Sequence, residues 1–180
     1  MTRAELEHAI RAACDVSGED RVIVFGSQAI LGQYPDAPVA LRQSLEADIA
    51  PGSGDPAAAD RIDGSLGEDS LFHRAHGFYV HGLTIDAASL PRGWERRTVP
   101  VRSEGTSDHT GLCIEAHDLA ASKLAAFREK DRDFVRTLLA ERLVRANKLL
   151  LRVQQLEGPT VDRDRIVRWI EVTCANLARG

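Results

Sequence analysis

Short apolar runs, separated by polar and turn-forming residues, alternate with helical patterns over the first two thirds of the chain. Residues 21–25 (RVIVF) combine β-branched and aromatic side chains in a run too brief for a core helix, so they predict a buried strand. Four later segments also have strand character: residues 44–51, 77–86, 94–102 and 111–116. Residues 3–14 and 55–66 show helical spacing. The pattern predicts an α/β (α+β) fold built on a mixed sheet.

After residue 116 the pattern becomes helical. Three segments carry apolar residues at helical spacing: residues 118–143, 146–158 and 161–178. Gly158-Pro159 and Asp162 are typical of a helix end and a helix start. We therefore expect a core formed by residues 1–116 and a helical C-terminal region, residues 117–180, packed on that core.

The strand at residues 21–25 stops abruptly at Gly26-Ser27. Glycine allows a tight turn or a close backbone approach, and serine is a frequent N-cap of a following helix. The free N–H groups at a helix start attract anions, so this turn is a candidate phosphate site. Many ordinary strand–helix turns look the same, and a purely structural role remains open.

Two acidic residues, Glu46 and Asp48, alternate with apolar residues in the strand predicted over residues 44–51. Because side chains alternate along a strand, both carboxylates point to the same side. Two carboxylates on one face suit Mg²⁺, which prefers oxygen ligands and often binds substrate phosphates as well. The same spacing is common on half-exposed strands, so taken alone it leaves a structural role open.

Composition places the chain among ordinary globular proteins. It has 180 residues, of which 43% are hydrophobic and 28% charged, and no apolar stretch approaches the length of a membrane span. The N-terminal segment MTRAELEHAIRAAC is a charged amphipathic helix without the apolar core of a signal peptide, so we expect a cytoplasmic protein. The three cysteines are far apart and predict neither a disulfide framework nor a zinc knuckle.

Charge is distributed unevenly along the chain. Residues 1–122 hold 10 Lys/Arg against 19 Asp/Glu, whereas residues 123–180 hold 13 against 8. An acidic first part favours cations, and a basic second part favours phosphates. Four arginines of the helical region either face an RNA backbone or are simply solvated: Arg136, Arg142, Arg145 and Arg152.

Together, the Gly-Ser turn and the acid-x-acid strand about 20 residues later resemble the active-site plan of the polymerase-β-like nucleotidyltransferase fold. Residues 117–135 (HDLAASKLAAFREKDRDFV) resemble a helix of the bacterial nucleotidyltransferase toxins of the abortive-infection AbiEii kind and their relatives. Segments FGSQAI, GEDSLFH and LPRGWERR extend the resemblance over most of residues 20–140. The matching positions in the helix are Lys123, Arg128, Lys130, Asp131 and Asp133.

The resemblance implies roles for these positions. Gly26 and Ser27 would bind the phosphates of a nucleoside triphosphate, and Glu46 and Asp48 would hold Mg²⁺, with a two-ion site as an option. In the second motif, a nucleotide-binding role is implied for Lys123 and Arg128. Asp131 would orient Lys123 or the attacking group.

Two features depart from the usual pattern of this fold. Glu46 stands where Asp is frequent, and a third carboxylate is often present on a neighbouring strand. Asp86, at the end of the strand predicted over residues 77–86, is the natural candidate, although it also suits a turn. His73, His76 and His81 match no closed zinc site, and we do not expect one there.

The resemblance implies an Mg²⁺-dependent enzyme that transfers a nucleoside monophosphate to an acceptor hydroxyl. It implies tRNA, at its 3′ end, as the acceptor, a toxin of a toxin–antitoxin system as the biological role, and a cognate antitoxin as partner. Two alternatives remain open at this stage. One is nucleotidylation of a protein or small-molecule hydroxyl, and the other is a catalytically weak nucleotide-binding module.

Overall fold

The computed structural model describes residues 1–159 and 161–179, and the chain divides into two compact units. Unit 1 comprises Met1–Ala88 and Arg97–Glu115 and contains the whole sheet. Unit 2 comprises Ser89–Arg96 and Ala116–Gly180 and is helical. The short segment Ser89–Arg96 thus belongs with the helices of unit 2, although in sequence it lies between strands of the sheet.

The five strands of unit 1 form one mixed sheet in the order β3-β2-β1-β5-β4. Their bounds are β1 Arg21–Phe25, β2 Glu46–Pro51, β3 Tyr79–Gly82, β4 Val99–Val101 and β5 Thr110–Cys113. In the centre, β1 pairs antiparallel with β2 and parallel with β5. At the edges, β3 runs parallel to β2, and β4 runs antiparallel to β5. The predicted α/β fold with a mixed sheet is confirmed.

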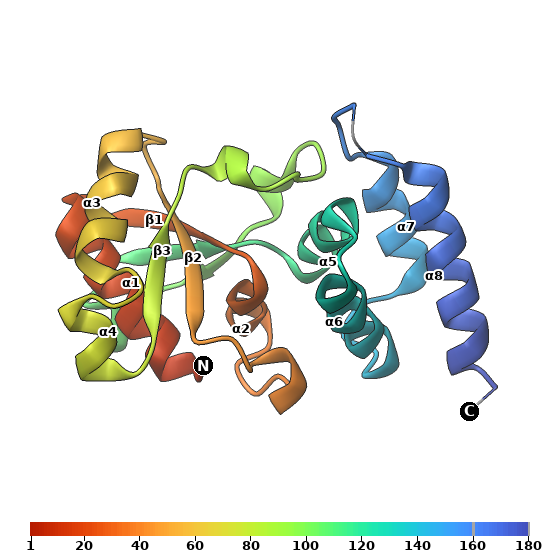
Figure 1. Ribbon diagram of the computed structural model, residues 1–180, viewed down its shortest axis with the longest axis horizontal. Helices are drawn as coiled ribbons and strands as arrows, with labels where there is room; N and C mark the ends of the chain where they lie inside the picture. Colours follow the sequence, from red (N-terminus) through yellow and green to blue (C-terminus); the bar gives the residue numbers. More distant parts are fainter. Residues whose placement is uncertain (160, 180) are drawn as a thin grey trace. The chain divides into compact units, whose positions relative to one another are not determined.

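Helices α1 (Arg3–Ser17), α2 (Ile30–Gln33), α3 (Pro56–Leu66) and α4 (Leu71–His76) complete unit 1, and Figure 1 shows α1, α3 and α4 beside strands β1 to β3. A capping box of Thr2 and Glu5 starts α1. The predicted apolar face of α1 is fully buried, and its Ile10 lies so close to Gly111 that a side chain there would collide with it. Glycine in β5 therefore lets α1 approach the sheet closely.

All four later strands are shorter in the structure than the sequence pattern indicates, and two of them are less than half the predicted length. The segment 77–86 is extended only over β3, and residues Ile85–Ala87 form a 3₁₀ turn. At Gly82 an added Cβ would lie 2.3 Å from the Ala59 carbonyl oxygen, so α3 crosses closely where the strand ends. In the segment 94–102, Trp94–Arg97 form a 3₁₀ turn and only Val99–Val101 pair with β5.

Helix α4 was not predicted, whereas the short helix expected after Ser27 is present as η1 and α2. Ser70 caps α4, because its side chain accepts a hydrogen bond from the His73 N–H, and Gly77 ends the helix with a φ of 76°. The other short turns of unit 1 are η1 Ser27–Ala29, η2 Val39–Leu41 and η5 Glu104–Thr106.

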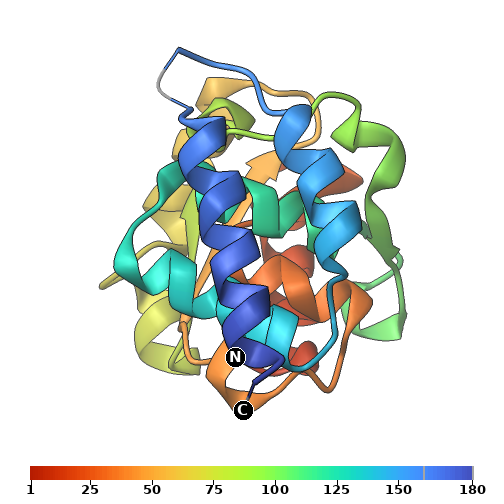
Figure 2. The same cartoon turned by 90° about the vertical axis from the view of Figure 1, so that its right-hand side faces the viewer.

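Over its described residues, unit 2 contains four α-helices: α5 (Ala116–Ala126), α6 (Glu129–Ala140), α7 (Ala146–Gln154) and α8 (Arg163–Leu177). Helices α7 and α8 lie side by side (Figure 2), and α5 contacts each of the other three. Within this unit Asp118 is fully buried and pairs with Arg152, with 2.8 Å between carboxylate oxygen and Nε. Arg152 therefore has a structural partner and is not one of the solvated arginines that the sequence allowed.

The single long helix expected over residues 118–143 is wrong, because the chain breaks between α5 and α6. Phe127 adopts a left-handed conformation with a φ of 53°, which a continuous helix does not allow. Arg128 then precedes the first turn of α6 as its N-cap residue. Among the described residues, none of the helices has both the length and the apolar character needed to cross a membrane.

Candidate metal and nucleotide site

Four polar side chains gather on one face of the sheet, on the neighbouring strands β2 and β3. The register pairs Glu46 with Tyr79 and Asp48 with His81. Ala47 and Ile49, which alternate with the two acidic residues, are fully buried on the opposite face. Glu46 and Asp48 keep 34% and 20% of their side chains exposed. The predicted pair of carboxylates on one strand face is therefore present and accessible to a ligand.

His81 lies between the two carboxylates. Its Nδ1 is 3.6 Å from Glu46 Oε1 and 3.5 Å from Asp48 Oδ1, and one donor atom of each residue lies within 4.8 Å of the others. This is a compact set of two oxygen donors and one nitrogen donor. Such a set fits a divalent cation, since two carboxylates on one side of a site are the usual protein ligands of Mg²⁺.

Tyr79 fixes the orientation of Glu46, because its hydroxyl donates a 2.8 Å hydrogen bond to Glu46 Oε2. Partial burial acts to raise the pKa of Glu46, but hydrogen bonds with Asp48 and Tyr79 and the neighbouring His81 outweigh it. The pKa of the Glu46 carboxyl is therefore below its ordinary value of 4.5. The pKa of Tyr79 is raised by burial and by its hydrogen bond to Glu46. Both shifts favour a charged Glu46 beside a neutral tyrosine.

Gly26 brings the backbone directly against the Asp48 carboxylate. It has a φ of 65°, and a Cβ placed on it would lie 1.8 Å from Asp48 Oδ2. Glycine is thus required here both for conformation and for space. Gly26, not Ser27, holds the N-cap position, and Ser27 is the first residue of the 3₁₀ turn η1. The prediction of Ser27 as an N-cap is therefore wrong, although the turn does lie against the Asp48 carboxylate.

The second group of predicted residues comes together in unit 2. Asp131 is fully buried, lies 3.5 Å from Lys123 Nζ, and accepts hydrogen bonds of 2.6 and 3.4 Å from Arg128. A straight helix would place Asp131 about 80° around from Lys123. The break at Phe127 removes that separation and lets α5 and α6 share the ion pair. Asp131 therefore contacts both Lys123 and Arg128, while the roles that the resemblance implied for these three residues at a nucleotide stay predictions.

Asp86 and the other histidines lie elsewhere. Asp86 is exposed in the 3₁₀ turn Ile85–Ala87 and does not belong to the cluster of metal-ligand atoms among the described residues. His76 packs edge-on against His8, and His73 accepts a hydrogen bond from the Asp69 N–H, so these two histidines have partners other than His81. Sequence reasoning missed His81. The available signal was its spacing of two from Tyr79 within a predicted strand.

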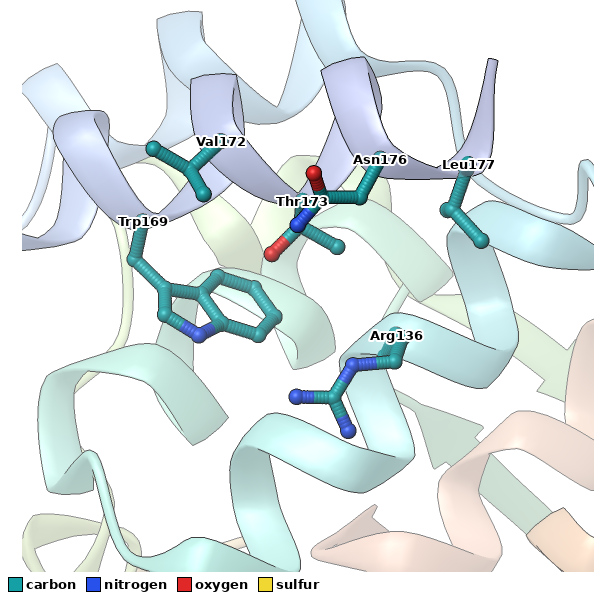
Figure 3. Close-up of a pocket in the computed structure, with 6 residues that line it drawn as sticks. All are labelled: Arg136, Trp169, Val172, Thr173, Asn176 and Leu177. Atoms are coloured by element: carbon teal, nitrogen blue, oxygen red, sulfur yellow. The ribbon is translucent and has the colours of Figure 1, made fainter. Parts of the chain in front are cut away.

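A pocket of about 290 Å³ lies within unit 2 between α6 and α8 (Figure 3). Figure 3 shows the Arg136 guanidinium directed towards the Trp169 ring, and the distance to the ring centroid is 6.0 Å. Nearby, Phe127 packs edge-on against Trp169. Two further arginines lie over the Phe127 ring, with the guanidinium carbon of Arg132 5.1 Å and that of Arg165 4.1 Å from the ring centroid. We call Phe127, Trp169, Arg132, Arg136 and Arg165 the aromatic–arginine cluster.

A mixed sheet in which a Gly-Ser turn faces an acid-x-acid strand is the arrangement of the nucleotidyltransferase class. A family model described as "Nucleotidyltransferase of unknown function (DUF6036)" matches residues 4–155. The chain therefore belongs to this family, and the predicted nucleotidyltransferase membership is confirmed at that level. No curated protein and no solved structure matches the chain significantly.

Proposed function

We propose that the protein transfers a nucleoside monophosphate from a nucleoside triphosphate to an acceptor hydroxyl and depends on a divalent cation. The observation that carries this proposal is the cluster of Glu46, Asp48 and His81, in which Asp48 lies against the Gly26 backbone. Membership in a nucleotidyltransferase family gives the cluster its chemical context.

In the proposed reaction the acceptor oxygen attacks the α-phosphorus, a new P–O bond forms, and the bond to the α,β-bridging oxygen breaks. Pyrophosphate leaves, and the hydroxyl proton passes to solvent. Glu46 and Asp48 would hold the cation, which when bound would neutralise phosphate charge and align the reacting groups. Tyr79 keeps Glu46 oriented, and Gly26 leaves room for the Asp48 carboxylate. Lys123, held by Asp131, would bind phosphate oxygens as a donor.

We further propose RNA as the acceptor, with the 3′ end of tRNA as the first choice. The basic helical region and the aromatic–arginine cluster support this, since RNA sites combine arginines with aromatic rings on which bases stack. The resemblance of residues 117–135 to the AbiEii-like toxins supports the same acceptor. On that resemblance the protein would act as a toxin in the cytoplasm with a cognate antitoxin.

The test is incubation of purified protein with total tRNA and each α-labelled nucleoside triphosphate, with Mg²⁺ or Mn²⁺ in separate reactions. The control is Asp48→Asn, which keeps the side-chain shape and removes the charge. We expect label on tRNA with the wild type and at least about 100-fold less with the variant, because loss of a direct ligand should exceed the 10–100-fold cost typical of supporting residues.

Other outcomes decide between the alternatives. Label on a lysate protein or a small molecule, and none on tRNA, would keep the chemistry and overturn the RNA acceptor. Absence of label with every acceptor would contradict the enzyme and favour a nucleotide-binding module. Equal labelling by Asp48→Asn would show that the chemistry lies outside this cluster.

A further inference from the structure

His81 lies on the strand next to the two carboxylates, the kind of place where the resembled fold often has a third carboxylate. The backbone register sets it directly opposite Asp48 on the adjacent strand, so its place depends on strand pairing rather than on a flexible loop. Its side chain is 43% exposed and its Nδ1 faces both carboxylates at nearly equal distances of 3.5 and 3.6 Å. Asp86, the expected third oxygen donor, lies beyond the end of the strand.

The spacing of these donors matches the requirements of a bound ion. Two ligand atoms that are each about 2.1 Å from an ion and subtend 90–109° lie about 3.0–3.4 Å apart. The observed separations of 3.5 and 3.6 Å need only a small adjustment to reach that range. Tyr79 engages Glu46 Oε2, which leaves Oε1, the oxygen nearest His81, to face the ion.

The nature of the donors then bears on which ion binds. Mg²⁺ is a hard ion that favours oxygen and usually keeps several waters, whereas an imidazole nitrogen is a better ligand for first-row transition ions than for Mg²⁺. A set of two carboxylates and one imidazole therefore differs in selectivity from the all-oxygen set that a third aspartate would have made.

We propose that His81 is a direct ligand of the cation at this site and makes it select a first-row transition ion, for which Mn²⁺ is the probe, over Mg²⁺. This inference rests on the cation site of the proposed function, but it concerns binding and not turnover. Glu46 Oε1, Asp48 Oδ1 and His81 Nδ1 supply the three protein donors, and water or substrate oxygens complete the coordination.

The direct test uses the wild-type chain and needs no substitution. Mn²⁺ bound to the purified protein should show ¹⁴N coupling in pulsed electron paramagnetic resonance, which reports a nitrogen ligand. Bound Mn²⁺ without this coupling would overturn the proposal, as would failure of the wild type to bind Mn²⁺.

Two substitutions test the selectivity. His81→Asp restores an all-oxygen set, and His81→Asn removes the imidazole with less change in charge. Mg²⁺ competition against bound Mn²⁺ should show the Mn²⁺ to Mg²⁺ affinity ratio falling by about tenfold or more in His81→Asp. The ¹⁴N coupling should disappear in both variants. An unchanged ratio in folded His81→Asp would contradict the selectivity.

The matched control is His76→Asn, because His76 packs edge-on against His8 and lies outside the cluster. It should keep both the affinity ratio and the ¹⁴N coupling. These measurements separate the two proposals. Nitrogen-ligated Mn²⁺ without any nucleotidyl transfer would support His81 as a ligand and contradict the proposed enzymatic activity. Transfer activity without ¹⁴N coupling would support the activity and contradict His81 as a ligand.

Discussion

At the scale of single residues, the site depends on how closely the Gly26 backbone approaches Asp48. The two oxygens of the Asp48 carboxylate have different neighbours: Oδ1 lies near His81, and Oδ2 fills the space that a side chain on Gly26 would need. The Asp48 carboxylate is therefore confined between His81 of β3 and the turn at Gly26. Confinement of this kind orients a ligand before the ion arrives, which lowers the cost of binding.

We expect Gly26→Ala to weaken cation binding strongly, because its Cβ would meet Asp48 Oδ2 at 1.8 Å and push the carboxylate away. The measurement is Mn²⁺ affinity. We expect it to fall by about 100-fold or more, because displacing a direct ligand should reduce affinity more than the 10–100-fold typical of changing a residue that only supports a ligand.

Gly54→Ala is the matched control for this substitution. Gly54 also has a positive φ, 76°, but an added Cβ there meets nothing within 4 Å. Both variants place alanine at a positive φ, which costs about 1–3 kcal/mol, and only Gly26→Ala also carries the collision. Equal cation affinity in the two variants would show that the contact with Asp48 is unimportant.

At the scale of elements, the break between α5 and α6 creates the ion-pair network of unit 2. Asp131, at the start of α6, is fully buried and forms ion pairs with Lys123 of α5 and with Arg128, which lies between the two helices. Near a helix N-terminus a carboxylate is also favoured by the helix dipole. The network thus joins two helices that the sequence pattern presents as one.

Asp131→Asn should destabilise the protein by about 3–5 kcal/mol, the range for removing one partner of a buried ion pair. Asp133→Asn, two residues along, breaks only an exposed pair with Arg136 and should cost less than about 1 kcal/mol. Urea unfolding of both variants measures the difference. A comparable cost for the two would mean that the buried network contributes little.

The elements also show what the sequence could and could not predict. Alternation predicted that Glu46 and Asp48 share a face, because that property is local to one strand. The role of His81 depends on the register between β2 and β3, strands about 30 residues apart, and no local pattern encodes that register. The helix break was missed because Phe127 is neither glycine nor proline, so its left-handed conformation left no signal in the sequence.

At the scale of the whole molecule, the two units differ in composition and in the ligand chemistry they offer. Unit 1 contains the sheet with the acidic cluster and the Gly26 turn. Unit 2 contains the buried Lys123–Asp131 pair and, with the aromatic–arginine cluster, a pocket lined by Trp169 and Arg136. Each unit thus carries one kind of chemistry that nucleotidyl transfer to RNA would need.

If RNA is the acceptor, Trp169→Leu should lower affinity for single-stranded RNA by roughly 5–150-fold, since stacking is worth about 1–3 kcal/mol per base. Fluorescence anisotropy with a labelled oligonucleotide measures this. Mn²⁺ affinity, read in the same variant, should not change. Val172→Ala, in the same pocket but without an aromatic ring, is the control. Unchanged RNA affinity in Trp169→Leu would show that the aromatic–arginine cluster does not bind RNA.

The edges of the sheet have a consequence for how copies of this chain behave at high concentration. The outer strands β3 and β4 have only four and three residues. The middle residue of β4, Pro100, has no N–H to offer to an incoming strand. Short edges interrupted by proline resist the edge-to-edge pairing that begins aggregation. The sheet that carries the acidic cluster is therefore protected against extension at the β4 edge.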